Sequence, residues 1–97
     1  MIRHLVLLKW NEGVDTAHVA AVKAGLDRLP DLIPEIVSFQ HGPDLQLMPG
    51  TADYAISADF ASTNDYFTYR ENPDHQKFIK ECLTYYCQRL VAQFSLD

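Results

Sequence analysis

Hydrophobic and polar residues alternate in four short stretches of this chain, a pattern typical of β-strands that bury one face. These stretches are residues 2–10, 36–41, 54–60 and 87–96. In the first stretch, one face carries Ile2, His4, Val6, Leu8 and Trp10. Leu5 and Leu7 lie on its other face, so both faces of this strand are expected to be covered.

Between the predicted strands, apolar residues recur at steps of three and four, as they do in amphipathic helices. The first predicted helix spans residues 16–29, with Asp15 as its N-cap and Pro30 as the residue that ends it. Two further helices are expected over residues 63–71 and 73–85. The resulting order, β-α-β-β-α-β with the second helix broken in two, predicts a ferredoxin-like α+β fold. In that fold four antiparallel strands carry the helices on one face.

A break between the last two predicted helices falls at Asn72-Pro73. Pro73 lacks an N–H and disfavours the helical conformation at the residue before it, so the preceding helix should end there. The same two residues suit a new helix start, with Asn72 as N-cap and Pro73 at the first position. His75 then heads an inward-facing stripe, which continues with Phe78, Ile79, Cys82 and Tyr86. An ionisable group on such a stripe is either a packed core residue or part of a site.

The second face of the predicted sheet indicates a partner. If His4 faces the helices, Leu5 and Leu7 lie on a sheet surface that no helix covers. An exposed apolar patch of this kind is typical of an interface. The simplest arrangement is a homodimer in which two sheets pack face to face about a two-fold axis.

Composition argues against several classes of partner. The chain has 97 residues and is expected to form one domain over residues 1–97. Its net charge is −5 and its eight Lys and Arg residues are scattered, which argues against binding to nucleic acid or to an anionic membrane. No apolar run approaches the ~18 residues of a membrane span, and the start of the chain does not resemble a secretory signal. The sequence therefore predicts a cytoplasmic protein.

No motif for a metal or an organic cofactor is visible in the sequence. There is no glycine-rich phosphate loop, and Cys82 and Cys87 do not have the spacing of a zinc site. Cys82 is instead expected to be a buried thiol. A metal held by His4, Asp74 and His75 is an alternative that no ligand spacing supports. We therefore expect no cofactor.

Six short segments, taken in order, cover nearly the whole chain and together carry a family resemblance. They are residues 4–9, 32–34, 38–42, 58–60, 72–75 and 91–94. In combination they resemble the stress-responsive A/B barrel (Dabb) family. The resemblance implies a dimeric α/β barrel built from two ferredoxin-like protomers.

The resemblance also implies a set of candidate catalytic residues. One plant member of the family is a polyketide cyclase that performs an intramolecular aldol condensation. By motif position, its catalytic residues correspond to His4, Tyr69 and His75 of this chain. This chain has Leu26 where the cyclase has a tyrosine on its first helix, so the cyclase's substrate does not carry over.

These three residue types suit proton transfer on a carbonyl compound. A neutral His75 could accept a proton from a carbon next to the carbonyl, and Tyr69 could donate to the developing enolate oxygen. His4 could hydrogen-bond His75 and fix its tautomer. Taken singly, His4 and Tyr69 also fit packed residues of a core. The predicted cavity wall is apolar and consists of Val6, Leu8, Val22, Leu26, Phe39, Phe78 and Tyr86.

Two functions stay open on the sequence alone. The first is a homodimeric stress-responsive A/B barrel protein with an apolar small-molecule pocket. The alternative is a cofactor-independent cyclase or lyase that performs aldol-type or proton-abstraction chemistry on an apolar carbonyl substrate. The sequence favours the first description, because one fold hosts many functions and residue types alone do not establish catalysis.

Overall fold

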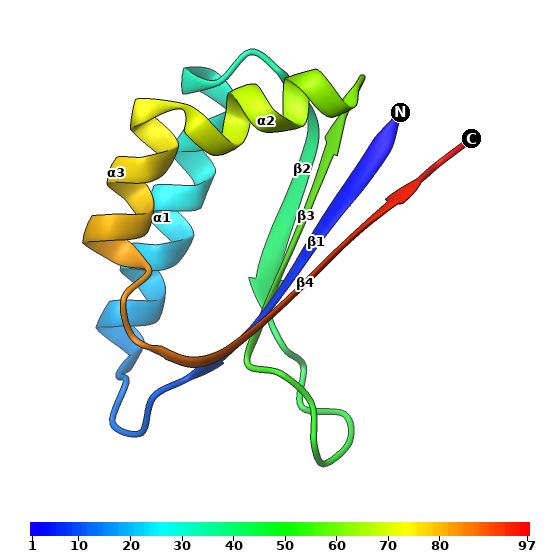
Figure 1. Ribbon diagram of the computed structural model, residues 1–97. Helices are drawn as coiled ribbons and strands as arrows, with labels where there is room; N and C mark the ends of the chain where they lie inside the picture. The colour runs from blue at the N-terminus through cyan, green and yellow to red at the C-terminus, as the bar shows by residue number, and fades with distance from the viewer.

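Four antiparallel strands form one sheet, and three helices cover only one of its faces (Figure 1). The computed structural model describes all residues, 1–97. In chain order the elements are β1 (Ile2–Trp10), α1 (Thr16–Leu32), β2 (Ile36–Pro43), β3 (Tyr54–Phe60), α2 (Thr63–Glu71), α3 (Pro73–Cys82) and β4 (Tyr86–Ser95). The strand order across the sheet is β2-β3-β1-β4, and all neighbours are antiparallel. The predicted ferredoxin-like α+β fold is confirmed.

The first helix is longer than the sequence predicts. α1 runs through Pro30 to Leu32, whereas the pattern predicts an end at Leu29. The missing N–H of Pro30 removes a single helical hydrogen bond, and this loss is small because the helix is already in its last turn. The Ile33 N–H still donates to the Leu29 carbonyl at 2.9 Å and closes that turn. The predicted stop at Pro30 is therefore wrong.

The third helix is shorter than predicted. α3 ends at Cys82, and the Leu83 N–H donates to the Ile79 carbonyl at 3.1 Å. Tyr86 is the first residue of β4, where it pairs with Trp10 of β1. Because backbone pairing with the sheet holds Tyr86 in an extended conformation, this residue does not belong to the helical stripe that the sequence assigns to it.

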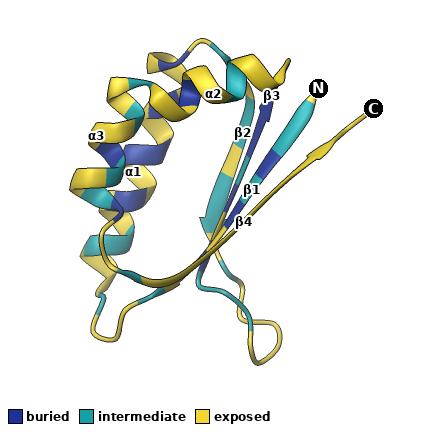
Figure 2. Cartoon of the chain, viewed as in Figure 1, coloured by how far each residue is buried: buried dark blue, intermediate teal, exposed yellow.

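The main core fills the space between α1 and the inner face of the sheet. Its largest fully buried side chains are Leu8, Val22, Leu26, Leu29, Ile33, Tyr54 and Phe60. Those on strands lie at alternate positions, and those on α1 recur at steps of three and four, as the sequence predicts (Figure 2). β4 is an edge strand and is exposed along nearly its whole length. The helices therefore cover the inner face least near β4.

A chain of hydrogen bonds that runs from the surface into the core ties α1 to the sheet. The His41 side chain of β2 is 7% exposed, and its Nε2 lies 2.8 Å from a carboxylate oxygen of Asp27 on α1. A carboxylate only accepts, so Nε2 carries the proton, and Nδ1 accepts from the Tyr54 hydroxyl at 2.7 Å. Burial raises the pKa of Tyr54 to about 12, which keeps this phenol protonated as the donor.

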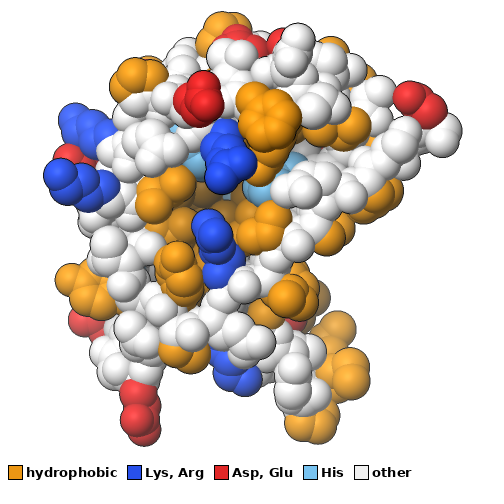
Figure 3. All heavy atoms as spheres, in the orientation of Figure 1, with side chains coloured by type: hydrophobic (Ala, Val, Ile, Leu, Met, Phe, Trp, Pro, Cys, Tyr) orange, Lys and Arg blue, Asp and Glu red, His pale blue; other side chains and the backbone are white.

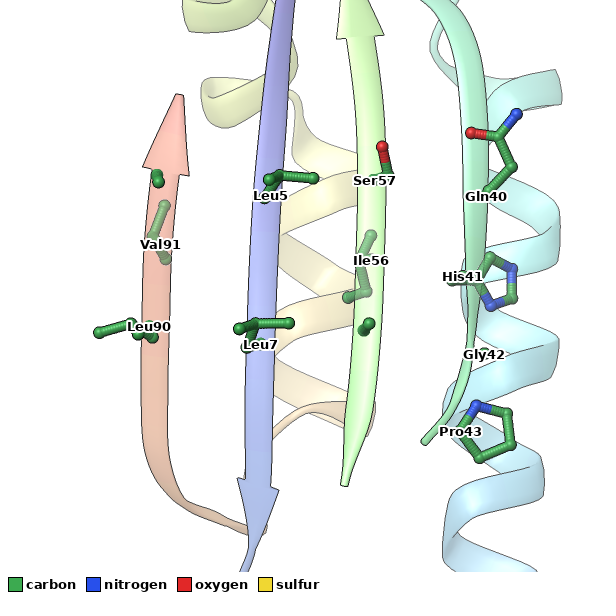
Figure 4. Close-up of a pocket in the computed structure, with 12 residues that line it drawn as sticks. Leu5, Leu7, Gln40, His41, Gly42, Pro43, Ile56, Ser57, Leu90 and Val91 are labelled. Atoms are coloured by element: carbon green, nitrogen blue, oxygen red, sulfur yellow. The ribbon is translucent and has the colours of Figure 1, made fainter. Parts of the chain in front are cut away.

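The outer face of the sheet is apolar and carries no helix (Figure 4). Its centre, which we call the apolar sheet face, consists of Leu5, Leu7, Ala55, Leu90 and Ala92. These side chains line an open hollow of about 440 Å³. Leu7 is 41% exposed and Leu90 is 62% exposed. Arg3 of β1 and Asp59 of β3 are paired on the same face, with Arg3 Nε 2.8 Å from Asp59 Oδ1.

Both cysteines are free thiols. Cys87 is exposed, and Cys82 is half-buried rather than fully buried as the sequence predicts, because it lies at the rim of the groove between α3 and α1. None of the three helices combines the length and the hydrophobicity needed to cross a membrane.

Gly25 marks a close approach of α3 to α1. A Cβ at this position would lie 2.6 Å from two ring carbons of Phe78. We expect Gly25→Ala to have two opposing effects on the free energy of unfolding. Forced repacking of Phe78 should lower it by about 1–3 kcal/mol, and the higher helix propensity of alanine should raise it by ~1 kcal/mol. Chemical denaturation measures this change. In a Phe78→Leu background the ring is gone, so the loss should shrink; an equal or larger loss there would contradict the proposed clash.

Candidate functional site

A cleft of about 510 Å³ opens between helices α2 and α3 and the β1–β4 side of the sheet. Ten of its sixteen lining residues are hydrophobic. The other six are His4, Arg70, His75, Gln76, Arg89 and Gln93. Figure 3 shows a hollow with hydrophobic and histidine side chains in its depth and basic side chains at its rim. The cleft is thus an apolar cavity with a few polar groups, as small-molecule sites commonly are.

The three residues that the sequence singles out meet in this cleft. His4 comes from β1, Tyr69 from the last turn of α2 and His75 from the first turn of α3. The ring centroid of Tyr69 lies 4.1 Å from that of His75 and 6.3 Å from that of His4. The break at Pro73 makes this possible. Asn72 caps α3 by accepting from the Asp74 N–H at 2.8 Å, so the chain turns between the two helices.

His4 is a neutral histidine in the depth of the cleft. It is 7% exposed, and its Nδ1 lies 2.9 Å from the side-chain nitrogen of Gln93, its partner in the β1–β4 ladder. An amide nitrogen donates, so Nδ1 accepts and the imidazole proton lies on Nε2. Burial, followed by the nearby His75 and Arg89, lowers the pKa of His4 to about 4. At neutral pH this ring therefore offers one N–H donor.

His75 has the opposite tautomer. Its Nδ1 lies 3.4 Å from the Arg70 carbonyl oxygen, a long contact in which only the nitrogen can donate. The proton on Nδ1 leaves Nε2 as the basic nitrogen of the ring. Burial lowers the pKa of His75, and the Arg70 carbonyl opposes this shift only in part. His75 is therefore an uncharged base next to Tyr69.

Tyr69 is buried against the sheet, with 4% of its surface exposed and its ring 4.9 Å from that of Phe60. Burial, and then the neighbouring Tyr66, raise the pKa of Tyr69, so its phenol stays protonated. The hydroxyl makes no hydrogen bond within the protein, yet it is not sealed inside the core. A protonated hydroxyl in this position is available to donate to a ligand.

The structure corrects two expectations about this site. His4 and His75 do not hydrogen-bond each other; the Nδ1 atom of His4 instead accepts from Gln93, and that of His75 donates to the Arg70 carbonyl. The predicted wall is also only partly right. Three of its residues line the cleft, namely Val6, Leu26 and Phe78.

The other four predicted wall residues lie elsewhere. Leu8 and Val22 are completely buried in the core beneath α1. Phe39 is on β2, at the sheet edge opposite β4, and Tyr86 belongs to β4 rather than to the stripe of α3. For Leu8, Val22 and Phe39 the reason is that α1 fills the space over most of the inner face, so the opening is confined to the side near β4. Tyr86 is on that side, but it lies at the start of β4, where it pairs with Trp10 and does not line the cleft.

Several cleft residues were missed by reasoning from the sequence. Tyr66 lies one helical turn before Tyr69, and its ring is 5.0 Å from that of His4. Gln93 and Arg89 face the cleft from β4, and Arg70 follows Tyr69 at the end of α2. Helical spacing could have indicated Tyr66. The β4 residues follow only from the register of β4 against β1, which neither strand shows by itself.

The arrangement can bind a carbonyl compound and move a proton on it. Tyr69 and His4 supply two donors, and His75 supplies a base. No three His, Cys, Asp or Glu side chains come together as a metal site, so the alternative of a metal on His4, Asp74 and His75 has no support in the geometry.

Comparison with known proteins agrees with this fold. The model of the family described as "Stress responsive A/B Barrel Domain" matches residues 2–96. A dimeric ferredoxin-like protein of unknown function from Thermobifida fusca is 34% identical with a TM-score of 0.91, over 98% of this chain and 90% of that one. A comparison with curated proteins finds no match.

Two more distant structures show the same fold. The hydroxynitrile lyase of Passiflora edulis is 19% identical with a TM-score of 0.87, over 99% of this chain and 93% of its own. A Dabb family protein from Mesorhizobium loti is also 19% identical, with a TM-score of 0.81 over 97% of this chain and 94% of its own. At this level of identity the likeness concerns the fold alone.

The neutral imidazole of His4 predicts a loss of stability in mild acid. A histidine of the unfolded chain takes up a proton near pH 6.5, but folded His4 does so only near pH 4. Because the unfolded state binds more protons in this window, the free energy of unfolding should fall as the pH falls from about 6.5 to about 4. His75, whose pKa is also lowered, contributes in the same direction.

Thermal melting at intervals across this pH range measures the effect. His4→Gln should melt with a shallower dependence on pH, because one of the two histidines is removed. An unchanged slope in this variant would contradict the assignment. Asp59, whose pKa is lowered by Arg3, affects the free energy of unfolding only below its ordinary pKa of 3.8, which lies outside this pH window.

Proposed function

Because the chain belongs to the stress-responsive A/B barrel domain family, we propose that it is a homodimeric protein whose cleft binds a small, largely apolar carbonyl compound. The observation that carries this proposal is the cleft itself. It has a volume of about 510 Å³, a mostly hydrophobic wall, and two imidazoles and a phenol close together. Small-molecule sites combine this size with a few convergent polar groups.

The unused donors of the cleft suit a carbonyl oxygen. The Tyr69 hydroxyl and the Nε2–H of His4 are both protonated, and neither is bound within the protein. A carbonyl oxygen has two lone pairs and no proton, so it can accept from both groups at once. An apolar body attached to that carbonyl would contact the hydrophobic wall, which includes Phe67, Phe78, Ile79 and Leu83.

A second function is favoured by a specific observation, the contact between His75 and Tyr69. Their rings are 4.1 Å apart, with a basic nitrogen on one and a protonated hydroxyl on the other. A base and an acid so placed can act together on a carbonyl compound. This supports a cofactor-independent lyase or cyclase. The hydroxynitrile lyase of Passiflora edulis is a lyase with the same fold, although a shared fold is only an analogy.

The proposed reaction begins with removal of a proton from the carbon next to the carbonyl. Nε2 of His75 takes that proton, and the electron pair of the C–H bond moves to form an enolate, whose oxygen accepts from Tyr69 and His4. In an aldol-type closure the enolate carbon then attacks a second carbonyl of the same molecule. The new alkoxide takes the proton back from His75, which returns the site to its starting state.

The homodimer is supported by the apolar sheet face. Leu7 and Leu90 are exposed at its centre, and an apolar patch of this kind is typical of an interface. The relative from Thermobifida fusca, 34% identical, is described as dimeric. A two-fold axis would place this face against the same face of a second copy and form a barrel from the two sheets.

Benzylacetone, a neutral ketone that carries a phenyl ring, tests binding and proton abstraction together. Titrated into isotope-labelled protein, it should shift the NMR signals of cleft residues. For the second function, protein-catalysed exchange of the hydrogens next to its carbonyl should appear in heavy water. His75→Ala should slow this exchange by about 10²–10⁴-fold, because the general base is lost. Tyr69→Phe should slow it less and keep binding.

His18→Asn is the control for these variants. It changes a histidine that packs against Trp10 and Tyr85, outside the cleft, and should alter neither binding nor exchange. Binding without exchange would support the first function and remove the second. If no cleft signal shifts, the proposed function is wrong as a whole.

The dimer is tested by sedimentation at micromolar concentration. We expect the wild-type chain of 11.1 kDa to be a dimer. Leu7→Asp should shift it to monomers, because a carboxylate would be buried in an apolar interface. Leu32→Asp changes an exposed leucine at the end of α1 and should leave the dimer intact. A monomeric wild type would contradict the homodimer. If the Leu7→Asp variant remains a dimer, the interface lies somewhere other than the apolar sheet face.

A further inference from the structure

The charge of the cleft is opposite to that of the chain. The protein has 13 acidic and eight basic residues and a net charge of −5. The cleft is nevertheless lined by Arg70 and Arg89 and by no Asp or Glu. With both imidazoles neutral, these two guanidiniums are the only full charges on its wall. The cleft is therefore a positive site on an acidic protein.

The two arginines come from opposite walls of the opening. Arg70 lies near the end of α2, and Arg89 lies on β4, across the gap that the helices leave. Figure 3 shows basic side chains on two sides of the hollow, with hydrophobic atoms between them. A group at the mouth of the cleft would therefore lie close to both walls.

Neither guanidinium has a partner within the protein. The ion pairs of the structure are Arg3–Asp59, Lys23–Asp27, His41–Asp27 and the N-terminus with Asp97. Glu71 and Asp74, the acidic residues nearest to Arg70 in the chain, form no ion pair with it. An arginine that is always charged and carries a planar set of donors suits bidentate binding of a carboxylate. Two such groups at one opening point to a ligand of opposite charge.

We propose that Arg70 and Arg89 recognise a carboxylate on the ligand, so that the cleft selects an apolar keto acid over a neutral ketone. This inference rests on the proposed function, because it takes the cleft as the binding site. The carboxylate would lie at the rim, the ketone oxygen at Tyr69 and His4, and the apolar body against the hydrophobic wall of the cleft. The field of Arg89 already reaches the floor, since its charge contributes to the lowered pKa of His4.

A matched pair of ligands tests this selectivity. Benzoylpropionate and its methyl ester share the aryl ketone and differ in the charge of one end. We expect calorimetry to show at least about tenfold tighter binding of the carboxylate, the effect of one charge-assisted hydrogen bond or more. Added salt should weaken binding of the carboxylate and leave binding of the ester nearly unchanged, because salt screens exposed charges.

Variants of the two arginines identify the source of the preference. Arg70→Gln and Arg89→Gln should each weaken binding of benzoylpropionate and leave binding of the ester unchanged. Arg89→Lys keeps the charge and should retain part of the preference. Arg28→Gln is the control, because it removes the same charge from the groove between α1 and α3, outside the cleft. It should behave as the wild type does.

The outcomes separate this inference from the proposed function. Equal affinity for the two ligands, or a carboxylate preference that survives in the Arg70→Gln/Arg89→Gln double variant, would overturn the role of the arginines. The cleft would still bind a ketone in either case, so the proposed function would stand. Failure of both ligands to bind would overturn both proposals.

Discussion

The structure depends on a sheet that is apolar on both faces, with helices that cover only one of them. Along β1, Val6 and Leu8 point to the helices, and Leu5 and Leu7 point away. Removing the inner face from water stabilises the fold by about 25 cal/mol for each Å² of apolar surface buried. The outer face contributes no such stabilisation until a second surface covers it. Dimer formation would thus extend to the outer face the same hydrophobic burial that folds the protomer.

The limited reach of the helices also creates the cleft. Three helices do not span four strands, so β4 stays exposed and the inner face is open beside it. The break at Pro73 then decides what faces this opening. In an unbroken helix, residues six apart point in directions about 120° apart, at 3.6 residues per turn. Because the chain restarts at Asn72-Pro73, Tyr69 and His75 instead bring their rings within 4.1 Å of each other.

Alternation along the sequence predicts all four strands to within two residues at each end, because a strand with one buried face leaves a period of two. Helix ends are less predictable: whether Pro30 stops α1 depends on one terminal hydrogen bond that composition does not show. The meeting of His4 with His75 could be expected, since both apolar stripes had to face inward. The residues of the cavity wall could not be predicted in the same way. The length and placement of the helices decide which inner-face residues are sealed in the core, as Leu8 is, and which reach an opening. Gln93 depends on strand register, a property of two segments together.

Electrostatics connects the rim of the cleft to its floor. Burial is the main cause of the lowered His4 pKa; repulsion from His75, when that ring is protonated, and from the permanent charge of Arg89 acts in the same direction. A carboxylate held at Arg89 would cancel part of that repulsion and raise the His4 pKa towards its ordinary value. A neutral ligand would leave it low. Because Tyr69 and His4 share one cleft with the arginines, the charge that selects a ligand would also adjust the proton-transfer groups. Selection at the rim and chemistry at the floor would then be one coupled property of this site.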